Sequence, residues 1–430
     1  MLRSIHCLQD VVDWGMCTGC GACYSLCTKN AVTLENIEHV GIRPRFKPAA
    51  CAGCTECLDI CPGYGVDASK YATKCTCAVQ TSHLIGPTIE VWEGYAADNE
   101  LRFRASSGGV LTALSLYCLE QEHMAFIFHT GMDPMAPWKN ITVQSSNRQQ
   151  LIRHAGSRYN ASSPCDSLAL IEACDRPCVF IGKPCDVAAV AALRAKRPAL
   201  DKNLGMVLTF FCAGTPSVSA TLDLLSKLAV DAAQVRGLRY RGNGWPGGFS
   251  IKKNTGSHCQ VLSYEDSWHF LQKYRCLRCH LCPDGLGEMA DISCGDAWHR
   301  HDKNSNDPGR SLVLVRSEHG REMLKKAIRA GYIQLTTSTP ENVIKAQGLV
   351  ARRRKIFGRL LAMKLLLIPA TQFTGFNLFR NWVGLSLLAQ IKTVFGTLKR
   401  LLHKKLWHKN SLDQSGRTNN FSQNILRRIA

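Results

Sequence analysis

Short apolar runs alternate with helical patterns through the middle of the chain. Three runs rich in β-forming residues are typical of buried strands, and they span residues 124–130, 178–182 and 206–211. Apolar positions recur at helical spacing in three further stretches, at 110–121, 186–195 and 217–229. This alternation predicts an α/β body with a mostly parallel sheet, whose ligand loops lie at the carboxyl ends of the strands.

The pattern changes on both sides of this body. Short cysteine-rich segments precede it and end at a breaker, Gly86-Pro87. After residue 341, apolar residues recur with a period near 3.6, while Lys and Arg interrupt every run. We therefore expect a small α+β domain at residues 1–85, an α/β domain at 86–341 and a helical, basic C-terminal tail at 342–430.

Charge and cysteine content narrow the class of protein. The formal charge is +20, but residues 342–430 hold 17 Lys and Arg and one acid, so the body is nearly neutral. That distribution argues against a nucleic-acid binder with a uniformly basic surface. No apolar run is long enough to span a bilayer and no signal peptide is evident, so we expect a cytoplasmic protein. In that compartment, 22 cysteines indicate metal-bound thiolates and not disulfides.

Two cysteine runs open the chain with the same spacing. The first run contains Cys17, Cys20, Cys23 and Cys27, and the second contains Cys51, Cys54, Cys57 and Cys61, followed by Pro62. Zinc also binds sets of four cysteines, but its sites usually pair two separated C-x2-C knuckles. A triple run that ends in x3-C and occurs twice is typical of a ferredoxin-like domain with two [4Fe–4S] clusters.

In this pattern, the last cysteine of each run crosses over to the other cluster. The first cysteine set is then Cys17, Cys20, Cys23 and Cys61, and the second cysteine set is Cys51, Cys54, Cys57 and Cys27. Two clusters that share crossed ligands lie close together. We therefore expect electrons to enter or leave through this domain.

The loops that follow the predicted strands are rich in small and polar residues. Ser106-Ser107-Gly108-Gly109 opens a helix and presents hydroxyls and amides suited to a phosphate. Related loops lie at 182–186, 212–217 and 241–248. Each is also compatible with plain turn chemistry, but four in one body favour a ligand site.

A third cysteine run lies late in the body. Local spacing assigns one more cubane to Cys276, Cys279, Cys282 and Cys294. The segment Ala290–Trp298, which reads ADISCGDAW, includes the last of these cysteines.

Six loops together resemble one known family. They are ASSGG at Ala105, GSRY at Gly156, GKPCD at Gly182, CAGTP at Cys212, RGNGWPG at Arg241 and RCHLCPDGLGEMADISCGDAW at Arg278. This combination is similar to the beta-subunit family of coenzyme F420-reducing hydrogenases and formate dehydrogenases, over roughly residues 15–340. The resemblance implies an oxidoreductase with FAD in the α/β body and iron–sulfur clusters nearby.

The resemblance also implies ligand sets. It assigns a body cluster to Cys279, Cys282, Cys185 and Cys212, which leaves Cys276 and Cys294 spare; the local-spacing alternative stays open. It places the flavin against Ser106, Ser107, Gly108, Gly109, Ser157, Lys183 and Asn243. Lys183 is then a partner for a flavin phosphate or for the reduced ring, unless it is a solvated turn lysine. No catalytic residue is assigned, and the polar candidates for a proton donor are Asp291, Asp296, His129 and His299.

These observations favour an iron–sulfur flavoprotein oxidoreductase. Electrons from ferredoxin or a redox partner subunit would pass through the clusters and FAD to a two-electron acceptor, F420-like or another reducible organic molecule. Two alternatives remain: a non-catalytic electron-transfer beta subunit of a larger redox complex, and an accessory protein of envelope polysaccharide synthesis. The C-terminal tail predicts either peripheral contact with an anionic membrane, at its inner face, or a packed helical extension.

Overall fold

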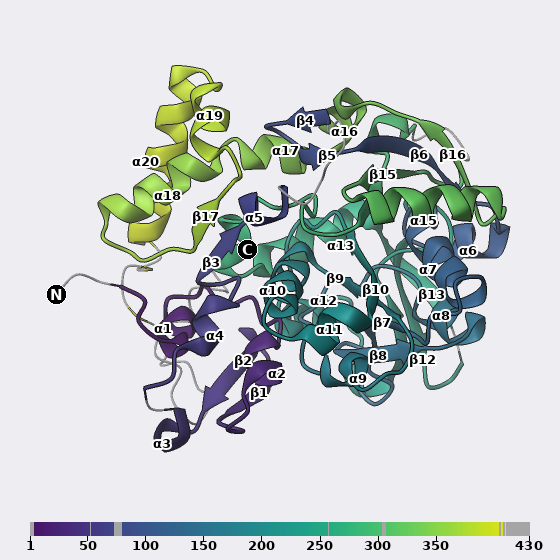
Figure 1. Cartoon of the computed structure of the whole chain (residues 1–430), viewed down its shortest axis with the longest axis horizontal. Coiled ribbons are helices and arrows are strands. Elements are labelled where there is room, and N and C mark those ends of the chain that lie inside the picture. The colour runs from purple at the N-terminus through teal and green to yellow at the C-terminus, as the bar shows by residue number, and fades with distance from the viewer. Residues whose placement is uncertain are drawn as a thin grey trace.

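The computed structural model describes residues 4–51, 53–72, 80–256, 258–302, 307–403, 406 and 409. The N-terminal domain is built from short elements around an antiparallel hairpin of β1 and β2 (Figure 1). Its elements are α1 (Leu8–Asp13), α2 (Ala22–Leu26), β1 (Val32–Ile37), β2 (Gly41–Phe46), α3 (Pro48–Cys51), α4 (Glu56–Asp59), β3 (Gly65–Asp67) and α5 (Ser69–Ala72). The cysteine runs occupy the loops and single turns between these elements, where a backbone can wrap around a cofactor.

In the described residues, the body contains an eight-stranded sheet with the order β16-β6-β15-β14-β10-β9-β7-β8. Its strands are β6 (Glu90–Ala96), β7 (Ile127–Met132), β8 (Asn140–Ser145), β9 (Cys178–Gly182), β10 (Leu204–Phe210), β14 (Ile292–Asp296), β15 (Ser311–Val315) and β16 (Ile333–Thr337). The neighbours β14, β10, β9 and β7 are parallel, whereas the outer pairings are antiparallel. The mostly parallel sheet expected from the sequence is confirmed for this centre.

Helices cover both faces of the sheet because successive strand side chains point to opposite sides. Ile127, Val179 and Leu208 pack under α7, α8 and α15. On the other face, Phe128 and Phe180 pack under α9, α10 and α11. The helices and the single turns of this body are α6 (Asn99–Arg104), α7 (Val110–Glu120), α8 (Arg148–His154), α9 (Ala169–Glu172), α10 (Pro184–Arg194), α11 (Pro198–Asn203), α14 (Leu277–His280), η3 (Trp298–Arg300), α15 (Glu318–Arg329) and α16 (Pro340–Ala346). The three predicted strands and three predicted helices correspond to β7, β9, β10, α7, α10 and α12 (Val218–Lys227).

Two small sheets flank the large one. The antiparallel sheet β11-β12-β13 packs against α12 and α13 through a separate apolar cluster. Its elements are α12 (Val218–Lys227), η1 (Ala232–Gln234), β11 (Val235–Arg239), β12 (Gly248–Lys253), β13 (His258–Ser263), α13 (Tyr264–Leu271) and η2 (Gln272–Tyr274). A short hairpin of β4 (Gln80–Ser82) and β5 (Gly86–Thr88) connects the N-terminal domain to the body.

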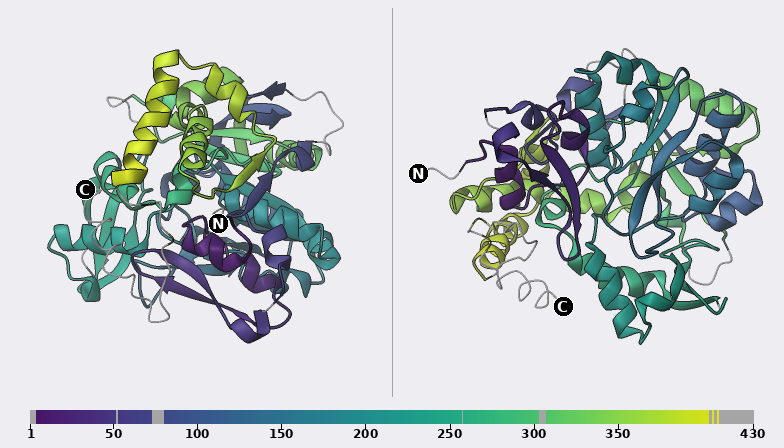
Figure 2. Two further views of the ribbon diagram at one scale, coloured as in Figure 1. Left: turned by 90° about the vertical axis from the view of Figure 1, so that its left-hand side faces the viewer. Right: turned by 90° about the horizontal axis from the view of Figure 1, so that it is seen from below.

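The C-terminal tail folds back on the N-terminal domain. It contains α17 (Gly348–Arg353), α18 (Ile356–Leu365), β17 (Gln372–Thr374), α19 (Leu378–Val383) and α20 (Leu387–His403). β17 pairs in parallel with β3, and Met363 and Leu401 join an apolar core with Val11 and Met16. Tail and N-terminal domain therefore lie side by side against the body (Figure 2). Most of residues 404–430 lies outside the described residues. No helix in the described ranges has both the length and the hydropathy that crossing a membrane requires.

Candidate iron–sulfur and cofactor site

The first cysteine set surrounds a small space in the N-terminal domain. Cys17, Cys20, Cys23 and Cys61 all line one cavity of about 20 Å³. Burial and the neighbouring Cys20 and Cys17 thiolates raise the pKa of Cys61, because like charges this close repel each other. The structure thus brings Cys61 from the second run to three cysteines of the first, as the crossover pattern expects. Four thiols around one space fit a [4Fe–4S] cluster.

In the second cysteine set, Cys27 of the first run lies near the cysteines of the second run. Burial and the charges of Cys27, Cys54 and Cys51 raise the pKa of Cys57 to about 11. The Cys27 Sγ accepts a hydrogen bond from the backbone amide of Ala31 over 3.3 Å. Across the described residues, no three His, Cys, Asp or Glu side chains converge as they would on a single metal ion. A cubane needs a wider arrangement, since it spreads its thiolates over four irons.

Five thiols form a body cysteine group at the junction of the body and the N-terminal domain. Its members are Cys185, Cys212, Cys276, Cys279 and Cys282. Burial and the charges of Cys279 and Cys282 raise the pKa of Cys212 to about 12. The Sγ atoms of Cys276 and Cys279 are 3.3 Å apart. Strand-end loops and the α14 segment therefore supply thiols to one place.

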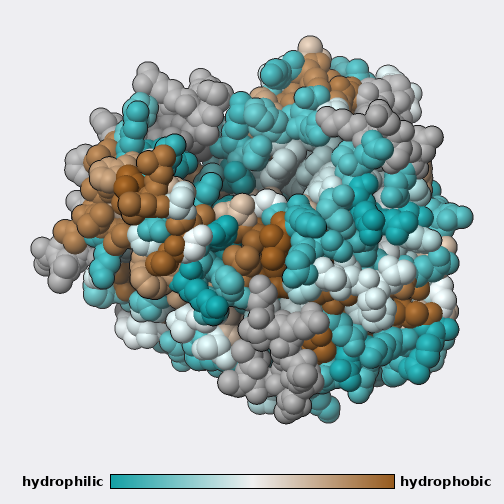
Figure 3. Space-filling view, turned by 90° about the horizontal axis from the view of Figure 1, so that it is seen from above, coloured by the Kyte–Doolittle hydropathy of each residue, from teal (hydrophilic) through white to brown (hydrophobic). Residues whose placement is uncertain are grey.

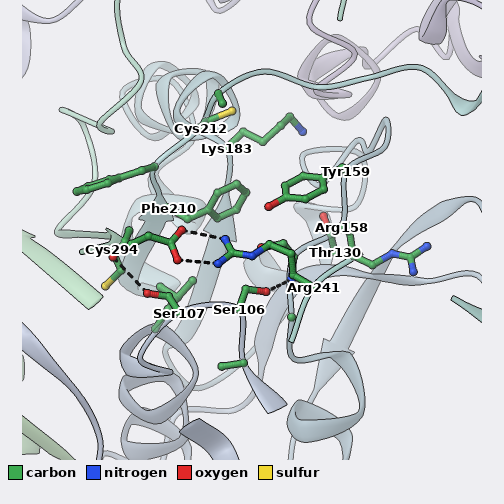
Figure 4. Close-up of a pocket in the computed structure, with 18 of the residues that line it drawn as sticks. Ser106, Ser107, Thr130, Arg158, Tyr159, Lys183, Phe210, Cys212, Arg241 and Cys294 are labelled. Carbon is green, nitrogen blue, oxygen red and sulfur yellow. Dashed lines mark hydrogen bonds and ion pairs between the residues drawn. The ribbon is translucent and has the colours of Figure 1, made fainter. Parts of the chain in front are cut away.

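Cys294 lies apart from this group. It is buried in β14 within the apolar core under α7, and burial alone raises its pKa to about 12. Figure 4 shows its side chain well away from Cys212. The arrangement therefore favours the ligand set Cys185, Cys212, Cys279 and Cys282 over the local-spacing set, and it adds Cys276 as a fifth nearby thiol.

A cavity of about 500 Å³ opens at the carboxyl ends of the central strands (Figure 4). Among the residues expected to contact a flavin, those that line it are Ser106, Ser107, Gly109, Ser157 and Lys183. Cys212 lines the same cavity, so the body cysteine group borders it directly.

Gly108 and Asn243 lie outside the cavity lining. A Cβ at Gly108 would come within 2.5 Å of the Gly94 carbonyl oxygen, so this glycine allows close packing against β6. Asn243 is exposed and has a φ of 57°, which shapes the loop between β11 and β12. Both residues therefore form the frame of the site and do not face its interior.

Lys183 is buried and paired, unlike a solvated turn lysine. Its Nζ lies 2.7 Å from Asp186 Oδ2 and donates to Ser162 Oγ over 2.9 Å. Burial opposes the charge, but Asp186 and the nearby Cys185 thiolate outweigh it and raise the pKa of Lys183. A fixed positive charge therefore lies where the body cysteine group meets the cavity.

An ion pair in the cavity wall was not predicted from the sequence. Arg241 donates from both terminal nitrogens to Asp296 at the end of β14, over 2.8 and 2.9 Å. Trp245 donates to the same carboxylate over 2.9 Å. The Trp298 ring stacks on Trp245 and on Tyr264 with centroid distances of 5.2 and 5.4 Å. In the sequence, the glycine-rich 241–248 loop indicated part of this wall. Nothing in the sequence indicated that Asp296 is the partner of Arg241.

The polar candidates for a proton donor separate into two pairs. His129 and Asp296 line the cavity, whereas Asp291 and His299 do not. Burial, with a smaller contribution from the charge of His154, lowers the pKa of His129 to about 3, so its ring is neutral near pH 7. Asp291 accepts from the backbone of Val207, and His299 contacts Glu93.

The fold and the cysteine sets define an α/β iron–sulfur protein with a ligand cavity at its strand ends. Residues 16–66 match the model of a 4Fe-4S dicluster domain. Residues 91–169 and 175–341 match the two models of the coenzyme F420 hydrogenase/dehydrogenase beta subunit, its N-terminal part and its C terminus. The chain belongs to this beta-subunit family, as its loops indicated.

Several relatives have names that describe coenzyme F420-dependent oxidoreductases. The coenzyme F420-dependent sulfite reductase of Methanocaldococcus jannaschii is 24% identical over 338 residues, which cover 75% of this chain and 47% of that protein. The F420-dependent formate dehydrogenase subunit beta of the same organism is 26% identical over 243 residues, 56% of this chain and 60% of that protein. The chain thus spans about half of the length of these relatives.

One solved structure shares the fold. A chain of the F420-reducing [NiFe] hydrogenase complex from Methanosarcina barkeri superposes with a TM-score of 0.52 at 19% identity. The match covers 66% of this chain and 96% of that chain. It supports the α/β architecture of the body.

Proposed function

We propose that this chain is an iron–sulfur flavoprotein oxidoreductase that moves electrons between ferredoxin-type [4Fe–4S] clusters, FAD and a two-electron acceptor. One observation carries the proposal: Cys212 belongs to the body cysteine group and also lines the large cavity. A cluster held there would border a cofactor in the cavity. The shared residue supports a redox role for the cavity over a purely structural one.

The cysteine sets form a series from the surface to the cavity. The backbone amide of Cys165, in the body, donates to the Cys20 carbonyl oxygen over 2.9 Å. This contact, together with the hydrogen bond from Arg278 to Pro62, supports a first cluster that adjoins the body cluster. We assign the second cysteine set to the outer end, where ferredoxin or a redox partner subunit would deliver or receive electrons.

The cavity walls fit a dinucleotide such as FAD. Gly109, at φ 78°, caps the eleven-residue helix α7, whose first residues line the cavity, and the amides at a helix N-terminus favour phosphate. The lining also holds Lys183, Arg158, Arg241, Arg275 and Arg352. These cations suit a pyrophosphate, and Lys183, Arg275 and Arg352 lie beside the body cysteine group. A bound flavin supplies the exchange between one-electron and two-electron chemistry.

The acceptor that we propose is F420-like or another reducible organic molecule, because the relatives are named for coenzyme F420. The formate dehydrogenase relative is also named as a subunit, which favours the second candidate, an electron-transfer subunit of a larger complex. The cytoplasmic location predicted from the sequence remains part of this proposal.

Metal and flavin content test the proposal directly. The chain, purified without oxygen and loaded with iron and sulfide, should contain about twelve irons for three cubanes and one FAD. Reduced ferredoxin should then bleach the flavin without any added subunit. Flavin reduction that requires a co-purified subunit would favour the electron-transfer alternative. Stoichiometric zinc with little iron, or no flavin in iron-loaded protein, would overturn the proposal.

We also propose that the C-terminal tail contacts an anionic membrane surface. One side of α18–α20 is packed, but a patch of large apolar side chains stays exposed, seen at the left of Figure 3. The patch consists of Leu365, Leu367, Phe379, Val383, Leu387, Leu388, Ile391, Phe395 and Leu402. Exposed Lys364, Arg380, Lys392 and Lys399 lie among these residues along the same helices. Apolar residues bordered by cations are typical of helices that lie in a lipid headgroup region.

A further inference from the structure

Two buried arginines cross the junction between the N-terminal domain and the body cysteine group. Arg43 comes from β2 and is 5% exposed, and Arg278 comes from α14 and is 2% exposed. Within the described part of the chain, neither forms an ion pair with a carboxylate. A guanidinium stays charged at any physiological pH, and burying it without an anion is costly. The position of each arginine therefore calls for an anionic neighbour.

Arg278 links the body cysteine group to the first cysteine set. It lies between Cys276 and Cys279 in α14, and its terminal nitrogen donates to the Pro62 carbonyl oxygen over 2.9 Å. Pro62 directly follows Cys61, the crossover member of the first set. The Nε atom of Arg278 is buried and has no hydrogen-bond partner in the described residues. Its guanidinium therefore retains one donor for an acceptor on the thiol side.

The ionised neighbours of Arg278 are thiolates. Its charged neighbours are Cys282 and Cys185, and Cys276 and Cys279 flank it in the chain. The guanidinium carbon also lies 4.6 Å from the centroid of the Phe373 ring, on β17 of the C-terminal tail. Arg278 thus touches all three parts of the chain at one point.

Arg43 makes the reciprocal connection from the other domain. Its terminal nitrogen donates to the Ile42 carbonyl oxygen over 2.7 Å, which fixes the side chain along its own strand. Its Nη1 atom lies 3.5 Å from the place that a Cβ on Gly19 would take, in the loop between Cys17 and Cys20, and its positive charge also reaches Cys276 of the body group. Arg43 of the N-terminal domain therefore reaches a thiol of the body group, and Arg278 of the body reaches the backbone next to Cys61.

We propose that Arg278 and Arg43 are positioning residues that hold the first cysteine set against the body cysteine group and stabilise the added negative charge when a cluster in either is reduced. The inference rests on the proposed function, because it requires clusters at both places. Each reduction adds one electron to one cluster, with no bond made or broken. Net charge and hydrogen bonds near the sulfurs control such potentials. Both clusters should therefore be easier to reduce than they would be without the arginines. The reduction potential of a cluster in the second cysteine set should not depend on them.

Redox titration followed by electron paramagnetic resonance tests this inference on the full, iron-loaded chain. In Arg278→Gln we expect the equilibrium constant for one-electron reduction of the first-set and body clusters to fall at least tenfold. Their reduction potentials should therefore fall by at least 59 mV. The second-set cluster should keep its potential. Signals are assigned with Cys54→Ser, which lacks a thiol of the second set. Arg43→Gln should shift the same two clusters in the same direction.

Matched variants separate charge from packing. Arg278→Lys keeps the charge and should shift the potentials less than Arg278→Gln. Arg316→Gln removes another buried arginine, whose ionised neighbours are Glu288, Asp284 and Arg353, and it should leave all three potentials in place. Unchanged potentials in both Gln variants with full iron, or an equal shift of all three clusters, would overturn the inference.

Iron content distinguishes the remaining outcomes. If both Gln variants lose iron while Arg278→Lys and Arg43→Lys keep it with near-normal potentials, the positive charge is required and the inference holds. If the Lys variants lose iron as well, the arginines have only a packing role and the inference is wrong. Failure of the wild-type chain to hold iron would instead reject the proposed function itself.

Discussion

Arg352 in the C-terminal tail donates a hydrogen bond to the carbonyl oxygen of Cys212 over 3.1 Å. Its other terminal nitrogen donates to the next carbonyl, that of Ala213, over 2.7 Å. Arg352 lies beyond residue 341, where the matched family region ends. The tail therefore helps to stabilise the loop that supplies a thiol to the body cysteine group, and it is part of the structure of the site.

Cysteine replacement should distinguish the two ligand sets of the body cluster. Cys212→Ser or Cys185→Ser should remove about four irons per chain, because both thiols lie in the body cysteine group. Cys294→Ser is the control and should remove none, since Cys294 is buried among apolar side chains. Iron and sulfide analysis measures both. Loss of iron from Cys294→Ser, with retention in Cys212→Ser, would restore the local-spacing set.

Gly109→Val should release the flavin and leave the N-terminal clusters in place. Gly109 has a left-handed φ of 78° and lines the cavity, so a branched side chain displaces the amides that open α7. Gly331→Val is a matched control, because Gly331 has a φ of 76° and open space around it. Flavin absorbance after gel filtration gives the readout. Equal flavin loss in both variants would indicate general strain and not a cofactor contact.

Asp296→Asn should destabilise the body by about 3–5 kcal/mol, because it leaves the buried Arg241 without its anion. The side chain of Arg241 is 3% exposed. Denaturant unfolding followed by circular dichroism measures the change. Asp59→Asn breaks the exposed pair with Lys196 and should cost less than about 1 kcal/mol. Similar free energies of unfolding for the two variants would contradict this account.

The exposed apolar patch of the tail should bind anionic vesicles in a salt-sensitive way. Leu388→Glu with Phe395→Glu should abolish sedimentation with such vesicles, because two carboxylates would enter the headgroup region. Binding by the wild type should weaken from 0.1 M to 1 M salt as the Debye length falls from about 10 Å to about 3 Å. Met135→Glu, at another exposed apolar residue, is the control.

Point substitutions suit this test better than deletion of the tail. Residues 372–374 complete a sheet with β3, and Arg353 forms a buried ion pair with Glu288. Truncation would therefore disturb the body itself. If the wild type ignores anionic vesicles but binds a redox partner through the patch, the membrane proposal is wrong.

Local spacing allowed the cysteine chemistry and three of the central strands, β7, β9 and β10, to be predicted. A run such as Cys17 to Cys27 specifies its own loop, and the resemblance supplied the strand-end thiols Cys185 and Cys212. The runs at β9 and β10 are short, apolar and buried on both faces, which makes them visible in the sequence. The outer strands β6 and β16 were not predicted, because they alternate polar and apolar residues and pair over long sequence distances.

The contacts that complete the site depend on such distant pairs. Arg241 meets Asp296 across 55 residues, and Arg278 meets Pro62 across 216. No local pattern marks either partner, because a buried arginine and a surface arginine look alike in a sequence. For the tail, the sequence left two alternatives open, a packed helical extension and contact with a membrane. The structure shows one packed side and one exposed side.

The pairing of β3 with β17 has a consequence for the order in which the chain is made. Thr371, beside β17, contacts Gly63 across 308 residues. At about 5–20 residues per second, a ribosome takes roughly 15–60 s to make the intervening chain. Until then the β3 edge has no partner strand, and Cys61, four residues earlier, has not reached its final surroundings. Completion of the sheet of β3 and β17 is thus a late event of biosynthesis, timed by the synthesis of the C-terminal tail.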